Sequence, residues 1–129
     1  MPAIKIARSE SRVTETPNAS MTTLASPTQG GTQALSLWRV AMRTGQHGPQ
    51  HTFDVEQAWH VLDGTATIVV DAESIGLSVG DTLVIPAGAH RQVSTESGAV
   101  FVITGPARGL ATPHSPAGPG DPVSPAWIV

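Results

Sequence analysis

The sequence of 129 residues contains no cysteine. This absence excludes a disulfide framework, a thiolate nucleophile and any sulfur ligand for a metal ion. A bound metal would therefore depend on nitrogen and oxygen ligands. Since disulfides are the usual marker of an oxidising compartment, the redox compartment cannot be read from this residue type.

Positive charge is also scarce. Lys and Arg together number seven against ten Asp and Glu, the net charge is −3, and no basic run occurs. Nucleic acids and anionic membranes are bound through clustered basic side chains. The composition therefore predicts neither of them as a partner.

Long apolar runs are missing as well. No stretch approaches the roughly 18 apolar residues of a membrane-spanning helix, and the N-terminal segment lacks the apolar core of a secretory signal. We therefore expect a soluble cytoplasmic protein. The length predicts a single domain, with its core between Leu35 and Ile103, where the apolar residues are concentrated.

No helical spacing of apolar residues is present, and the central segment alternates with a period of two instead. Short strands are predicted at residues 35–42, 51–57, 58–62, 65–70, 75–79, 82–86, 91–93 and 99–104. The dipeptide Asp63-Gly64 predicts a hairpin turn between two of these strands. Short strands with turns at this spacing predict an all-β, antiparallel sandwich or barrel.

The two ends of the chain differ from this central barrel, which we place at residues 33–105. Residues 1–32 are rich in Ser, Thr, Pro and Gly and predict an arm that pairs with the barrel or with a second subunit; a disordered loop is the alternative. The prolines of residues 106–129 exclude regular secondary structure. The apolar triplet 127–129 predicts that this tail packs back on the barrel, and a solvated tail is the alternative.

Two spaced motifs run through the barrel segment. In the first, five residues separate Gly45 from His51, and Phe53, Gln57 and Gly64 follow at fixed intervals. In the second, five residues separate Gly80 from Pro86-Ala87-Gly88, and two more precede Arg91. The spacing resembles the two motifs of the cupin superfamily. The first cupin motif is G-x5-H-x-H-x3–4-E-x6-G, and the second is G-x5-P-x-G-x2-H, where x is any residue. The resemblance covers roughly residues 35–104 and implies a jelly-roll β-barrel.

The resemblance also implies a metal site, which this sequence departs from. Metal-binding cupins use the two histidines and the glutamate of the first motif and the histidine of the second. Only His51 is kept, whereas Phe53, Gln57 and Arg91 stand at the other three positions. A guanidinium cation cannot serve as a ligand. We therefore expect no metal; the alternative is a divalent Zn, Fe or Ni ion at an atypical site built from His51, Gln57, His47 or His90.

Strand alternation predicts a pocket inside the barrel. It directs His51, Gln57 and Arg91 inward, and the residues expected to contact the substrate are Phe53, Trp59, Trp38, Arg39 and His47. His51, with an ordinary pKa near 6.5, is the expected acid/base, and Arg91 with Gln57 would stabilise an oxyanion. The alternatives are that Arg91 pairs with Asp54 or Glu56 and that the aromatic side chains only fill the barrel.

The resemblance extends to small single-domain cupins of natural-product pathways, some of which are cyclases or isomerases. The sequence therefore predicts a metal-free cyclase, isomerase or dehydratase of secondary metabolism that acts on an anionic or carbonyl-bearing, polyketide-like small molecule. A non-catalytic binding cupin, acting as a sensor or carrier, is one alternative, and a metal-dependent dioxygenase with atypical ligands is the other. We also predict a homodimer, because exposed sheet edges often pair in such barrels.

Overall fold

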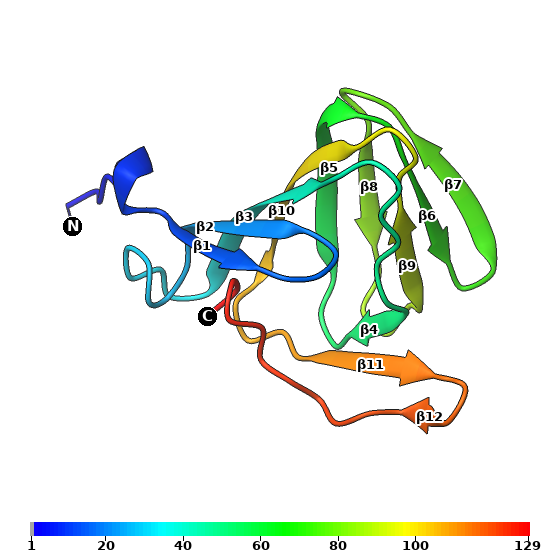
Figure 1. Cartoon of the computed structure of the whole chain (residues 1–129). Helices are drawn as coiled ribbons and strands as arrows, with labels where there is room; N and C mark the ends of the chain where they lie inside the picture. Colours follow the sequence, from blue (N-terminus) through cyan, green and yellow to red (C-terminus); the bar gives the residue numbers. More distant parts are fainter. Residues whose placement is uncertain (1) are drawn as a thin grey trace.

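The computed structural model describes residues 2–129, which form two facing antiparallel sheets of six strands each (Figure 1). The first sheet has the order β1 (Arg12–Glu15), β2 (Ser20–Ala25), β3 (Leu35–Met42), β10 (Ala99–Pro106), β5 (Gln57–Gly64) and β8 (Thr82–Ile85). The second has the order β12 (Gly118–Pro119), β11 (Ala111–Ser115), β4 (His51–Phe53), β9 (Arg91–Ser94), β6 (Ala66–Val70) and β7 (Glu73–Leu77). A short 3-10 helix, η1, covers Arg8–Glu10. This arrangement is the predicted all-β cupin jelly roll.

The alternation of side chains along the strands builds the core. In β3, Trp38, Val40 and Met42 are buried between the sheets, whereas Leu35 and Leu37 on the other face are exposed. Strands β5 and β10 contribute Val61, Phe101 and Ile103 in the same way. Each fully buried side chain of this size stabilises the fold by roughly 1.5–3 kcal/mol.

The predicted hairpin at Asp63-Gly64 is wrong. Strand β5 pairs with β10 and β8, and β6 pairs with β7 and β9, so the chain crosses from one sheet to the other after Gly64. Gly64 has a φ of 73°, and a Cβ there would clash with the carbonyl of Gly98. Because Gly64 has no side chain, two backbone segments can lie close together where the chain crosses between the sheets. Gly64 is not part of a two-residue hairpin turn.

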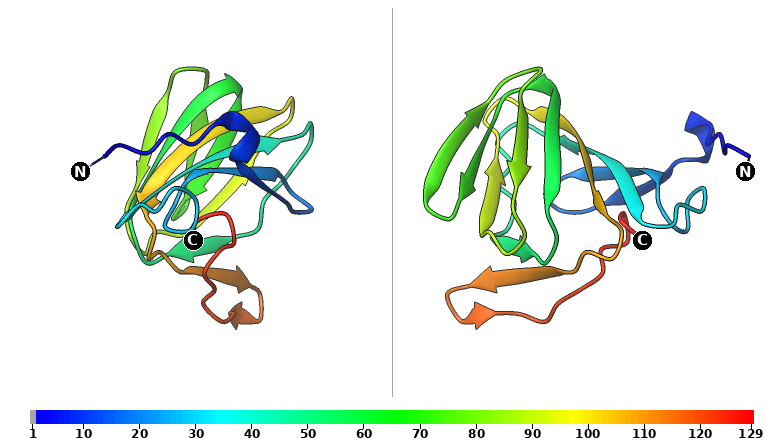
Figure 2. Two further views of the ribbon diagram at one scale, coloured as in Figure 1. Left: turned by 90° about the vertical axis from the view of Figure 1, so that its left-hand side faces the viewer. Right: turned by 180° about the vertical axis from the view of Figure 1, so that it is seen from behind.

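The arm belongs to the first sheet. Strands β1 and β2 form a hairpin, and β2 pairs with β3 through register partners such as Thr22 and Arg39. Figure 2 shows this hairpin extending the sheet on one side, while β11 and β12 project below the barrel.

The tail contains regular structure, contrary to the sequence-based prediction. Strand β11 pairs with β4, and the two residues of β12 pair with β11. Pro113 is accommodated because its carbonyl accepts the N–H of Gly120, while Pro119 lies in the edge strand β12. A proline removes one donor from a ladder but leaves its acceptor, which is why edge positions tolerate it.

The last three residues are anchored by buried hydroxyl groups. Thr23 Oγ1 donates to the carbonyl of Trp127 at 2.8 Å, Ser36 Oγ donates to that of Ile128, and Ser26 Oγ donates to that of Val129 at 2.7 Å. The side chain of Ile128 lies in the core. The tail therefore closes one side of the barrel.

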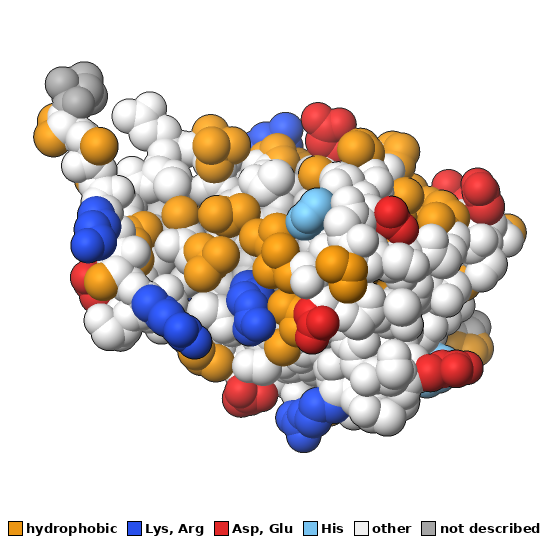
Figure 3. All heavy atoms as spheres, turned by 90° about the horizontal axis from the view of Figure 1, so that it is seen from above, with side chains coloured by type: hydrophobic (Ala, Val, Ile, Leu, Met, Phe, Trp, Pro, Cys, Tyr) orange, Lys and Arg blue, Asp and Glu red, His pale blue; other side chains and the backbone are white. Residues whose placement is uncertain are grey.

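No helix among residues 2–129 has the length and apolar character that crossing a membrane would need. On the face shown in Figure 3, apolar side chains lie between charged ones. The exposed large apolar residues of the protein include Leu35, Leu37 and Val84, on the outer side of the first sheet.

Candidate functional site

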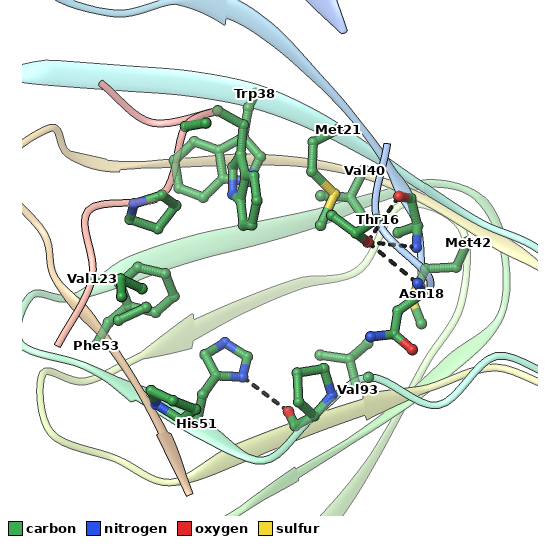
Figure 4. Close-up of a pocket in the computed structure, with 18 of the residues that line it drawn as sticks. Thr16, Asn18, Met21, Trp38, Val40, Met42, His51, Phe53, Val93 and Val123 are labelled. Carbon is green, nitrogen blue, oxygen red and sulfur yellow. Dashed lines mark hydrogen bonds between the residues drawn. The ribbon is translucent and has the colours of Figure 1, made fainter. Parts of the chain in front are cut away.

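A cavity of about 470 Å³ lies between the two sheets (Figure 4). Strands β3, β4, β5 and β9 supply its inner walls, and the loop before β4, the arm and the tail supply the rest. Its lining consists of Thr16, Asn18, Ala19, Met21, Trp38, Val40, Met42, Gly48, Pro49, His51, Phe53, Trp59, Val93, Ala111, Pro113, Val123, Ser124, Pro125, Ala126 and Trp127. The volume is typical of small-molecule sites.

The walls are mostly apolar and strongly aromatic. All three tryptophans of the chain, Trp38, Trp59 and Trp127, line the cavity together with Phe53. Trp59 is fixed by an edge-to-face contact with the core ring of Phe101, with centroids 5.2 Å apart. Such walls favour a flat, largely apolar ligand.

His51 is the one titratable side chain among the lining residues just named. Because neighbours along a strand alternate, β4 directs His51 and Phe53 inward and Thr52 outward, where the Thr52 hydroxyl contacts His114 Nε2 at 3.1 Å. The imidazole meets the Phe53 ring edge-on at 5.5 Å. His51 Nδ1 lies 3.0 Å from the Pro49 carbonyl oxygen, and the other ring nitrogen points into the cavity.

The bond to Pro49 determines the tautomer of His51. A carbonyl oxygen can only accept, so Nδ1 carries the proton and Nε2 presents its lone pair to the cavity. Burial lowers the pKa of His51 below its usual 6.5 and outweighs the hydrogen bond to Pro49, which raises it; the charges of Arg91 and His114 add lesser lowering effects. The imidazole is therefore neutral near pH 7 and can act as a base.

Gln57 and Arg91 lie behind the cavity wall, with exposures of 2% and 1%. Arg91 Nη1 donates to Gln57 Oε1 at 3.1 Å, and Trp59 Nε1 donates to the same oxygen at 3.1 Å. Arg91 Nη2 also donates to the Ala89 carbonyl at 3.3 Å, while its Nε–H has no partner. The guanidinium stands 5.3 Å from the centroid of Phe53, one aromatic ring away from the cavity.

Within residues 2–129, Arg91 is thus a buried cation whose hydrogen-bond partners are an amide and a backbone carbonyl, and no carboxylate pairs with it. The alternative pairing with Asp54 or Glu56 does not occur, because Asp54 Oδ1 accepts the N–H of Leu110 and Glu56 is exposed. Burial lowers the pKa of Arg91 to about 10, and Asp71 opposes this shift. The guanidinium therefore remains charged near pH 7. Neither Arg91 nor Gln57 reaches the cavity surface, so their contact with a ligand stays a prediction.

The cupin domain family matches residues 38–105, which is more than half of the chain and includes both spaced motifs. The chain belongs to the cupin family. A comparison with curated protein sequences finds no match.

Solved cupin structures share the fold at low sequence identity. An RmlC-like cupin from Shewanella frigidimarina superposes with a TM-score of 0.68 at 17% identity, covering 78% of this chain and 87% of that one. The polyketide cyclase RemF from Streptomyces resistomycificus gives 0.70 at 18% identity, with 81% and 80% covered. A variant of oxalate decarboxylase from Bacillus subtilis gives 0.72 at 14% identity, covering 80% of this chain and 29% of that one. At these identities the likeness shows the fold alone.

Two residues expected in the cupin pocket lie outside it. Arg39 is exposed on the outer face of β3, because its neighbour Trp38 takes the inner face. His47 is exposed in the loop before β4, where Gly48 and Pro49, and not the imidazole, border the cavity. Arg39 and His47 therefore do not line this cavity, whereas Trp38, Phe53 and Trp59 do, and contact of any of the five with a substrate stays a prediction.

The residues at the cupin metal position do not fit a divalent ion. His90, offered by the sequence as an extra ligand, is exposed and packs on the His114 ring at 4.4 Å, away from the cavity. Gln57 Oε1 already accepts two donors, and the adjacent Arg91 is a cation that would repel a metal. Across residues 2–129, no three His, Asp or Glu side chains converge as a ligand group. We therefore derive no chemistry through a metal.

The two spaced motifs did not predict that residues of the arm and the tail line the cavity. Asn18 and Met21 from the arm, and Val123 to Trp127 from the tail, complete the cavity of this cupin. Only the apolar triplet at 127–129 signalled that the tail would be packed. Asn18 carried no signal, because a single polar residue in a Ser/Thr/Pro-rich stretch reads as loop.

Proposed function

We propose that this cupin is an enzyme that binds a largely apolar, ring-containing small molecule and moves a proton with His51. The observation that carries the proposal is that one neutral imidazole faces a cavity whose other walls are almost entirely apolar and aromatic. Cyclisation, isomerisation and dehydration through an enolate-like species all need such a base. The fold shared with the polyketide cyclase RemF supports a polyketide-like substrate of secondary metabolism.

His51 acts through Nε2. This nitrogen takes a proton from an acidic C–H or O–H of the substrate, while the Nδ1–H to Pro49 bond holds the ring and stabilises the imidazolium that forms. The same imidazolium then returns the proton to another atom of the substrate. Arg91, behind Phe53, supplies fixed positive charge that favours negative charge developing in the cavity.

The lining favours a carbonyl-bearing substrate over an anionic one. No Lys or Arg side chain belongs to the lining, and burying an unpaired carboxylate in an apolar cavity is costly. A neutral ketone or phenol has no such cost. The proposed substrate is therefore an uncharged aromatic ketone or phenol.

A non-catalytic binding cupin is the second candidate. The cavity would serve it equally well, and the single titratable group would then matter only for affinity. Replacing His51 separates the two candidates, since a carrier loses affinity at most, whereas an enzyme loses turnover.

General-base activity can be measured without the natural substrate. The probe is 5-nitrobenzisoxazole, a flat apolar bicycle whose ring C–H is removed by a base while its N–O bond breaks, giving a coloured cyanophenolate. We expect the wild-type protein to accelerate this opening above free imidazole at equal concentration, because the cavity desolvates the base. The variant His51→Ala should lose about 100-fold or more of that rate.

The matched control is His60→Ala, which removes a histidine of β5 that contacts Thr82 Oγ1 at 2.7 Å on the outer face. It should keep the wild-type rate. Equal rates for His51→Ala and the wild type would refute the catalytic role of His51. Binding of the probe without acceleration would favour the carrier.

A further inference from the structure

The arm places a free amide in the cavity wall. Asn18 lies in the turn between β1 and β2 and is among the lining residues. Figure 4 shows its side chain beside Met42, towards the end of the cavity away from Phe53 and His51. Across the described residues, 2–129, the Asn18 side chain makes no hydrogen bond to protein, so its N–H donors are available to a ligand.

The turn that carries Asn18 is held together by hydrogen bonds of Thr16. Thr16 Oγ1 donates to the Ala19 carbonyl at 3.0 Å and accepts the backbone N–H groups of Ala19 at 3.1 Å and Asn18 at 3.3 Å. Thr16 N also donates to the Ala19 carbonyl at 2.9 Å. These bonds use the Thr16 hydroxyl within the turn, so Thr16 offers no free donor to the cavity and Asn18 does.

The polar groups of the cavity therefore divide by hydrogen-bond type. His51 Nε2 carries a lone pair and can only accept, because Nδ1 holds the proton. A carbonyl oxygen of a ligand is also only a hydrogen-bond acceptor, so it cannot form a hydrogen bond with His51 Nε2. Four side chains of the lining have donors that form no hydrogen bond within residues 2–129, namely Asn18, Ser124, Trp38 and Trp127. Ser124 is exposed in the tail and each indole has a single N–H, whereas the Asn18 amide has two N–H donors.

We propose that Asn18 is the specificity-determining residue of the cavity: it binds a carbonyl oxygen of the ligand and thereby turns the acidic end of the molecule towards His51. This inference rests on the proposed function, since it assigns a substrate orientation to the same cavity. It selects ring systems that carry a ketone oxygen at one end and an acidic C–H or O–H at the other.

The test compares two tricyclic probes of matched shape, fluorenone and fluorene, which differ by one carbonyl oxygen. Their dissociation constants are measured by equilibrium dialysis with the wild type, Asn18→Leu and Ser124→Ala. The leucine keeps the size of the asparagine and removes its donors. Asn18→Leu should weaken fluorenone binding about 3- to 10-fold, the value of one hydrogen bond, and leave fluorene binding unchanged or slightly stronger.

A second variant separates the lost donor from a disturbed turn. Asn18→Asp keeps the shape and polarity but has only acceptors, so it should weaken fluorenone binding at least as much as Asn18→Leu. Ser124→Ala should not change the ratio of the two affinities. Equal losses for both probes in Asn18→Leu, or a change in the ratio caused by Ser124→Ala instead, would overturn the assignment. If neither probe binds the wild type, the proposed function fails together with this inference.

Discussion

The residue with the least ordinary environment is Arg91. Its guanidinium is almost fully buried, and in the part of the chain that the structure describes it has no carboxylate partner and its Nε–H is unpaired. Removing a charge from water costs several kcal/mol unless hydrogen bonds or an opposite charge compensate for it. Two hydrogen bonds compensate for it: Gln57 Oε1 accepts from Arg91 Nη1, and the Ala89 carbonyl accepts from Arg91 Nη2. Gln57 Oε1 also accepts from Trp59 Nε1.

Two substitutions of Gln57 that are similar in size should therefore have different effects on the free energy of unfolding. Gln57→Leu leaves two buried donors unpaired and should lower the free energy of unfolding by about 2–5 kcal/mol. Gln57→Glu keeps both hydrogen bonds and adds an opposite charge beside Arg91, so the free energy of unfolding should be equal to the wild type or higher. Urea denaturation measures both changes. Similar losses in the two variants would show that Gln57 does not compensate the Arg91 charge.

At the scale of single residues, the sequence predicted the direction of a side chain better than it predicted its hydrogen-bond partners. The period of two directed His51, Phe53, Gln57, Trp59 and Arg91 inward, and all five side chains do face the barrel interior. It could not tell that Gln57 and Arg91 would bond to each other behind the cavity wall, because alternation fixes direction and not depth. It also could not choose between Trp38 and Arg39 until the burial of β3 was known.

At the scale of elements, regular alternation predicted the central strands. The turn dipeptide and the tail prolines led to two wrong predictions, a hairpin and a tail without strands. Asp63-Gly64 is a strong hairpin signal, but the contact of Gly64 with the Gly98 backbone serves a crossover between sheets. The tail prolines argued against strands, but β11 and β12 place two of them where a missing donor costs little. Both errors came from long-range pairing, which local sequence signals do not contain.

The anchoring of the tail gives a prediction for an element. Thr23 and Ser36 are fully buried, and their hydroxyls hold the carbonyls of Trp127 and Ile128. The double variant Thr23→Val/Ser36→Ala should lower the free energy of unfolding by about 1–3 kcal/mol. It should also speed hydrogen exchange of the Ile128 N–H, which donates to the Pro125 carbonyl.

Thr22→Val is the control for this pair, because Thr22 lies beside Thr23 on β2 and makes no contact with the tail among the hydrogen bonds of the structure. It should leave the exchange of Ile128 as in the wild type. Unchanged exchange in the double variant would mean that the hydroxyls do not hold the tail.

At the scale of the whole molecule, the cavity is assembled from segments far apart in the sequence. More than half of its lining residues lie outside residues 38–105, the part that matches the cupin family. The motif-bearing barrel was predictable because its glycines and spacing are local features. The wall from the arm and tail was not, because it depends on packing between residues about 100 positions apart, such as Thr23 and Trp127.

The homodimer stays a prediction. Strand β1 is an edge of the first sheet, and the outer face of that sheet exposes Leu35, Leu37 and Val84. Pairing of two copies would cover such a surface. Light scattering should give a mass twice that of the 13.3 kDa chain. A mass of one chain at micromolar concentration would contradict it.

A neutral His51 whose Nε2 faces an apolar cavity is the central feature of the proposed site. Because burial and the Arg91 charge lower its pKa, the unfolded chain binds more protons than the folded one between that lowered pKa and 6.5. His51 should therefore reduce stability as the pH falls through this window and have no such effect above it. Proton removal from 5-nitrobenzisoxazole should weaken only below pH 6.5.

The most direct measurement is a titration of the His51 ring nitrogens by nitrogen-15 NMR, assigned with His51→Ala. The structure predicts the Nδ1–H tautomer near pH 7 and a midpoint below 6.5. An Nε2–H tautomer, or a midpoint at or above 6.5, would contradict it.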